Sequence, residues 1–100
     1  MSVGWVARIP YVEGKRAEGA AAMAEALPRL RALPGVEALY FHNDANDPNL
    51  VWAYWRLASR DDIAAVYESE AFLSMAKGRM ELFAGRPEDV FLEDDTSFGS

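Results

Sequence analysis

Residues 50–59 read LVWAYWRLAS, and this stretch decides the fold. Its aromatic and β-branched residues are typical of a β-strand, in which successive side chains point to opposite faces. Alternation therefore divides the stretch into two rows, Val51, Ala53, Trp55 and Leu57 on one face and Leu50, Trp52, Tyr54 and Arg56 on the other. Because large aromatic side chains lie in both rows, we expect both faces of this strand to be covered.

The composition narrows the class of protein. The chain has 100 residues, a formal net charge of −6 and no cysteine. This length predicts one domain over residues 1–100 with a single core, and residues 94–100 read as a loose tail. The negative charge disfavours binding to nucleic acid phosphates, and the lack of cysteine excludes disulfides and thiolate chemistry. With neither a signal-peptide pattern nor a long apolar run, we expect a soluble cytoplasmic protein that does not enter a membrane.

Three further segments are predicted to be strands. Residues 36–42 lead through the polar turn NDANDPN into the strand at 50–59, which predicts an antiparallel hairpin. Residues 3–12 are rich in β-forming residues, and Glu88 to Glu93 are expected to form a short last strand.

Two helical regions are predicted between the strands. The first runs from about residue 15 to 33, and Pro28 is expected to kink it or to separate its last turn. The second begins after Ser59, which resembles a capping box together with Asp62. Its apolar periodicity breaks near Ser69, which indicates two helical pieces with this serine as the N-cap of the second.

The order β-α-β-β-α-β is the ferredoxin-like pattern, an α+β fold in which an antiparallel sheet carries helices on one face. The other face would then present Trp52 and Tyr54, an aromatic patch that soluble monomers seldom expose. We therefore expect a homodimer in which two sheets pack face to face, a dimeric α+β barrel. The alternative is that the C-terminal tail, with Phe98, covers this face.

Three short motifs carry a family resemblance: LPGV at residues 33–36, AYWRLAS at 53–59 and SEAF at 69–72. They are similar to segments of the dimeric α+β barrel superfamily, in particular of the antibiotic biosynthesis monooxygenase-like domains. The ending ELFAGRPEDVFLED also resembles EthD-type proteins. The first resemblance implies a cofactor-independent monooxygenase that binds a phenol, a quinol or a polyketide-like aromatic in an apolar pocket.

The resemblance implies a set of pocket residues. It places Trp55 in the pocket, where the indole N–H could donate to a phenolic or quinone oxygen. Val51 and Val66 occupy positions at which family members carry an asparagine and a histidine. Tyr67 could supply a hydroxyl group, although a core tyrosine is the alternative. Phe72 is assigned to substrate binding, and its helical spacing also fits a core stripe.

Two charged or titratable residues are further candidates. His42, the only histidine, could accept a proton from a phenol if it faces the cavity with Tyr40. His42 and Tyr67 are thus the candidate catalytic residues, and a solvent-exposed strand end is the alternative for His42. Arg8 could hold an anionic substrate group or pair with a carboxylate across the sheet. No metal site is expected, because His42 has no second imidazole near it in the sequence.

Two other functions remain open. At positions 51 and 66 this chain has valine where family members have an asparagine and a histidine. The loss of these two polar groups favours a non-catalytic ligand-binding or assembly protein of the same fold. A lactone or carbonyl isomerase would need a base near its substrate. The available bases would be His42, Tyr67 or a strand carboxylate such as Glu37.

Overall fold

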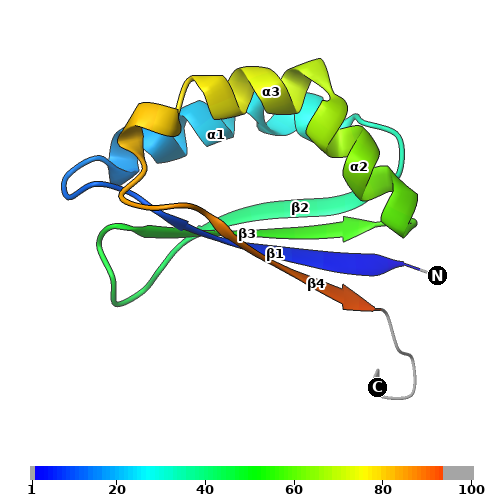
Figure 1. The fold of residues 1–100 in the computed structure, drawn as a ribbon, viewed down its shortest axis with the longest axis horizontal. Helices are drawn as coiled ribbons and strands as arrows, with labels where there is room; N and C mark the ends of the chain where they lie inside the picture. The colour runs from blue at the N-terminus through cyan, green and yellow to red at the C-terminus, as the bar shows by residue number, and fades with distance from the viewer. Residues whose placement is uncertain (1, 94–100) are drawn as a thin grey trace.

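A four-stranded antiparallel sheet and a layer of helices on one of its faces make up the computed structural model, which describes residues 2–93 (Figure 1). The elements follow in the order β1 (Val3–Pro10), α1 (Arg16–Arg31), β2 (Val36–Asn43), β3 (Leu50–Leu57), α2 (Arg60–Glu68), α3 (Glu70–Lys77), the 3-10 turn η1 (Met80–Leu82) and β4 (Glu88–Glu93). The strands lie side by side in the order β2-β3-β1-β4. This arrangement confirms the predicted ferredoxin-like α+β fold.

The two faces of β3 differ as its alternation predicts. Val51, Ala53 and Trp55 are buried beneath the helices, whereas Trp52 and Tyr54 are only partly covered. The face opposite the helices, called the open face below, has no helix over it among residues 2–93 (Figure 1). Exposed apolar side chains extend it on the neighbouring strands: Tyr40 on β2 and Val90 and Leu92 on β4. The tail containing Phe98 lies outside the described residues.

Helix α1 is continuous through Pro28, so the predicted separation of its last turn is wrong. Proline lacks an N–H, but only one backbone hydrogen bond is lost, and the N–H of Ala32 still bonds to the carbonyl of Pro28 at 3.2 Å. Gly19 brings the helix close to Tyr11, the residue that follows β1, because a Cβ at this position would overlap the tyrosine ring.

The break between α2 and α3 falls where the sequence predicts it. The hydroxyl of Ser69 accepts a hydrogen bond of 3.2 Å from the backbone N–H of Phe72, which confirms Ser69 as an N-cap. The capping box predicted at Ser59 is wrong in its bonding. Its hydroxyl donates to the carboxylate of Asp62 at 2.9 Å and caps no backbone N–H, and the N–H of Asp62 bonds to the backbone carbonyl of Ser59 at 3.2 Å instead.

Side-chain hydrogen bonds fix the turn between β2 and β3. The carboxylate of Asp44 accepts from the indole N–H of Trp52 at 2.8 Å and from two backbone N–H groups of the turn. These bonds, that of Trp52 foremost, lower the pKa of Asp44 below its ordinary value. Arg16 of α1 donates to two carbonyls of the same turn.

No helix among the described residues is long and apolar enough to cross a bilayer.

Candidate active site

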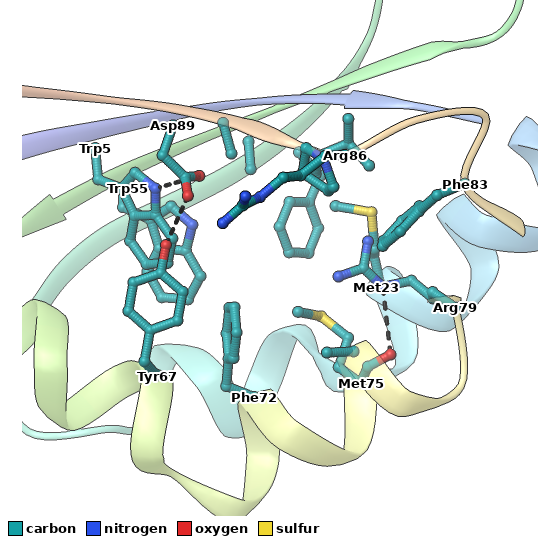
Figure 2. Close-up of a pocket in the computed structure, with 16 residues that line it drawn as sticks. Trp5, Met23, Trp55, Tyr67, Phe72, Met75, Arg79, Phe83, Arg86 and Asp89 are labelled. Atoms are coloured by element: carbon teal, nitrogen blue, oxygen red, sulfur yellow. Dashed lines mark hydrogen bonds between the residues drawn. The ribbon is translucent and has the colours of Figure 1, made fainter. Parts of the chain in front are cut away.

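A pocket of about 410 Å³ opens between the covered face of the sheet and α3 (Figure 2). Its volume lies in the range of small-molecule sites, about 300–1,000 Å³. Side chains from all four strands, from the three α-helices and from the segment that leads into β4 line it, and most of them are apolar or aromatic.

One wall of the pocket is aromatic. Trp5 and Trp55 lie opposite each other on β1 and β3, and directly opposed residues share a sheet face. Their rings stack with centroids 4.8 Å apart and an angle of 17° between the planes. Tyr67 and Phe72 pack against Trp5 from the helix layer, with centroids at 4.9 and 5.9 Å. The result is a rigid surface suited to a flat aromatic ring.

A carboxylate stands beside this wall. Asp89 of β4 accepts hydrogen bonds from the indole N–H of Trp5 at 2.9 Å and from the hydroxyl of Tyr67 at 2.7 Å. Burial, and then the bond to Asp89, raise the pKa of Tyr67 well above its ordinary value. Tyr67 therefore stays protonated near neutral pH and acts as a donor. Asp89 is the only carboxylate among the described residues that line this pocket.

The far end of the pocket is cationic. Arg79 is only 4% exposed, and its guanidinium donates to the hydroxyl of Tyr11 at 2.9 Å and to the carbonyl of Met75 at 3.3 Å. Arg86 reaches into the same pocket from the segment before β4 (Figure 2). The pocket thus has the Asp89 carboxylate toward one end and the Arg79 guanidinium toward the other, and the Arg86 guanidinium extends between them (Figure 2).

Several residues predicted from the sequence meet here. Trp55, Tyr67 and Phe72 all line the pocket. Val66 is buried in the core and does not line it. Val51 lies on the covered face but lines a second pocket, of about 320 Å³, between α1 and β2.

His42 and Arg8 lie elsewhere. In the sheet register both stand opposite Trp52, on the open face, and neither lines the pocket beside Trp55. Strand alternation turns Phe41 toward the pocket beside Trp55, whereas the exposed His42 lines the second pocket together with Tyr40. Arg8 forms an ion pair of 3.8 Å with Glu88 of β4, the cross-sheet alternative predicted for it.

Of the pocket residues that the sequence analysis did not assign to the site, four matter most for its chemistry: Trp5, Arg79, Arg86 and Asp89. Alternation along residues 3–12 could have placed Trp5 on a covered face, since Val3, Trp5 and Ala7 form one row. No local pattern marks the other three. Among residues 2–93, no group of three or more histidines or acidic residues could hold a metal ion.

Comparison with known proteins identifies the fold. No protein-family model and no curated protein matches the chain. Among solved structures, a candidate antibiotic biosynthesis monooxygenase from Nitrosomonas europaea superimposes with a TM-score of 0.89 at 17% identity, over 93% of this chain and 89% of that one. Another from Caulobacter crescentus gives 0.87 at 18%, over 94% and 90%. A third, from Bordetella bronchiseptica, gives 0.83 at 20%, over 94% and 97%.

These likenesses extend over almost the whole chain, while few residues are identical. They confirm the predicted resemblance at the level of the fold, and the likeness to EthD-type proteins stays a prediction. The chain has the α+β fold of the antibiotic biosynthesis monooxygenase-like domains.

Proposed function

We propose that this protein is a cofactor-independent monooxygenase that oxidises a small aromatic substrate in the pocket beside Trp55. The observation that carries the proposal is the stacked Trp5–Trp55 wall with the carboxylate of Asp89 beside it. An apolar pocket with few converging polar groups is the usual form of a small-molecule site. The names of the three structural neighbours support the same class of reaction.

The chemistry needs a substrate that can reduce dioxygen. A phenol with a free para position loses its hydroxyl proton, and its anion transfers one electron to dioxygen. The two radicals combine to form a carbon–oxygen bond, and the resulting hydroperoxide loses water to give a quinone. The sum is one phenol plus one dioxygen giving one quinone plus one water. The protein would contribute positioning of the ring, exclusion of water and a proton acceptor.

Asp89 is the proposed proton acceptor, in place of His42. It has the position, because it lines the pocket and is fixed by two hydrogen bonds. Proton transfer to a carboxylate requires an acidic proton, such as that of a phenol or an anthrone. Tyr67 positions Asp89 and is not itself a base, because its pKa is raised.

Oxygen uptake tests the proposal. Purified protein is mixed with 1-naphthol or anthrone in an oxygen electrode, and the quinone product is measured by absorbance. Asp89→Asn is expected to lower the rate by about a hundredfold, the usual size of an acid–base contribution. Asp61→Asn, on the exposed start of α2, is the matched control and should keep the full rate. No uptake by the unaltered protein across such phenols and anthrones would contradict the proposal.

A non-catalytic ligand-binding protein is the second candidate. Val51 and Val66 are both buried and apolar. Neither supplies the asparagine or histidine side chain that the family resemblance implies for an oxygenase. Ligand binding without oxygen uptake would favour this candidate. A lactone or carbonyl isomerase is a third, with Asp89 as its base, because Glu37 lies beside Arg56 and Ser2 and does not line the pocket.

We also propose that the open face pairs with a second copy of the chain. Tyr54 lies in register with Tyr40 on one side and with Val6 on the other, and Val6 is in register with Val90. These side chains form a continuous apolar strip across all four strands, and monomers seldom expose so large a patch. A two-fold axis through the strip would cover both copies at once.

The cytoplasmic location also stays a prediction.

A further inference from the structure

We infer that the ligand of the pocket beside Trp55 is an aromatic acid, whose ring lies on the tryptophan wall and whose carboxylate is held by Arg79 and Arg86. The inference rests on the proposed function, because it names the substrate class of the same pocket. It starts from a charge that the fold buries without an opposite charge beside it.

Arg79 has only neutral partners. Its Nε donates to the carbonyl of Met75 at 3.3 Å, and its Nη1 donates to the hydroxyl of Tyr11 at 2.9 Å. The ring of Phe83 lies 5.3 Å from the guanidinium carbon. Within residues 2–93, no carboxylate lies within 4.0 Å of this guanidinium. Burying a charge is costly unless an opposite charge accompanies it.

The rest of the guanidinium is turned toward the pocket (Figure 2). A guanidinium carries five N–H donors, and two of those of Arg79 are used by Tyr11 and Met75. The remaining donors can take a ligand that offers acceptor oxygens. A carboxylate provides both the missing negative charge and two oxygens in the planar geometry that a guanidinium matches.

Arg86 adds a second positive charge to the pocket. It comes from the segment between η1 and β4, and its guanidinium also extends into the pocket (Figure 2). The part of the chain that the structure describes gives it no ion-pair partner. In Figure 2 this guanidinium points toward the Asp89 side of the pocket, and because the side chain is exposed it has the freedom to turn toward a carboxylate that Arg79 holds.

Asp89 sets the direction of the ligand. It lies at the end of the pocket opposite Arg79 (Figure 2), where its charge would repel a ligand carboxylate. The acid group is therefore expected at the Arg79 end. A hydroxyl at the other end of the ring system would reach Asp89, the proposed proton acceptor. The pocket selects an aromatic acid whose hydroxyl and carboxylate lie at opposite ends.

Three probes test this selection by calorimetric titration. The first, 6-hydroxy-2-naphthoate, carries its two groups at opposite ends of the rings; the second, 3-hydroxy-2-naphthoate, carries them side by side; and 2-naphthol has no acid group. The first is expected to bind about tenfold more tightly than the other two, which corresponds to one charge-assisted interaction. Its advantage should shrink as salt is added.

Arg86→Gln is the main variant, because an exposed side chain with no partner among residues 2–93 is not needed for folding. It should remove most of the tenfold advantage and change the affinity for 2-naphthol much less. Arg79→Gln should do the same where it folds. Arg29→Gln, on the exposed side of α1, is the matched control and should change neither affinity.

Two results would overturn the inference. In the first, the unaltered protein binds 2-naphthol and 6-hydroxy-2-naphthoate equally well, which leaves the proposed oxygenase pocket intact and removes its acid selectivity. In the second, Arg86→Gln keeps the full advantage of the acid. Binding of none of the three probes would contradict the aromatic pocket itself, and the inference with it.

Discussion

The hydroxyl of Tyr67 on α2 donates a hydrogen bond of 2.7 Å to the carboxylate of Asp89 on β4. The same carboxylate accepts from the indole of Trp5 on β1. One acidic side chain on the outer strand thus links a helix to the tryptophan wall of the pocket. The geometry of the proposed proton acceptor therefore depends on Tyr67.

The pKa of Tyr67 predicts how stability changes with pH. Its folded-state pKa is raised above the ordinary value of 10, so its contribution to stability is complete below about pH 10 and declines as the pH rises above that value. Tyr67→Phe is expected to lower the free energy of unfolding by about 1 kcal/mol at neutral pH. Urea titrations at several pH values should show the difference between the two proteins shrinking above about pH 10. A difference that stays constant with pH would contradict the raised pKa.

The tryptophan wall predicts a selective effect on ring binding. Trp55→Phe shortens the surface on which a ligand ring lies, so its affinity for 2-naphthol should fall by about threefold to tenfold, the size of one aromatic contact. Trp52 lies on the same strand but on its open face, so Trp52→Phe should leave this affinity unchanged. Calorimetric titration distinguishes the two variants. Equal losses from both would contradict the assignment of the pocket to the covered face.

The close approach of α1 to Tyr11 predicts a position where alanine is worse than glycine. Alanine is normally favoured in a helix by about 1 kcal/mol. At Gly19, however, a Cβ would overlap the ring of Tyr11, so Gly19→Ala is expected to destabilise the fold by about 1–3 kcal/mol. Gly78→Ala is the control, since a Cβ there would lie 3.7 Å from its nearest neighbour. Thermal melts of both variants measure the difference, and a stabilised Gly19→Ala would refute the packing argument.

The proposed dimer predicts that a charge on the open face separates the subunits. Tyr54→Glu would bury a carboxylate in the sheet-to-sheet contact without a partner, which costs several kcal/mol. Light scattering should then report a monomer or an aggregate. Tyr54 is preferred to Trp52 because Trp52 also bonds to Asp44 and orders the turn.

The matched control for the dimer is Leu73→Glu, because Leu73 is 55% exposed on the helix layer, away from the open face. It should keep the oligomeric state of the unaltered protein. A Tyr54→Glu variant that remains a stable dimer would contradict the placement of the interface.

Much of the fold follows from local sequence rules. Alternation in LVWAYWRLAS separates the buried face of β3 from the open one, and the structure agrees. The bounds of β4 and the break at Ser69 are also as predicted. Each of these depends on neighbours a few residues apart, whose relation is set by strand pleat, helical pitch or a capping bond.

The hydrogen bonds between pocket residues could not be predicted from such local rules. Trp5 and Asp89 are separated by 84 positions, and Tyr11 and Arg79 by 68, yet each pair is hydrogen bonded. The face of His42 was left open for a similar reason, since alternation gives two rows but not which row meets the helices.

The sequence by itself thus determined the order of the elements and the two rows of β3, because periodicity and capping act over short distances. Only the tertiary structure decided which charges meet in the pocket. Strand pairing β1–β3 and β1–β4 sets the register of residues far apart in the chain, and a shift of one residue would turn Asp89 to the open face.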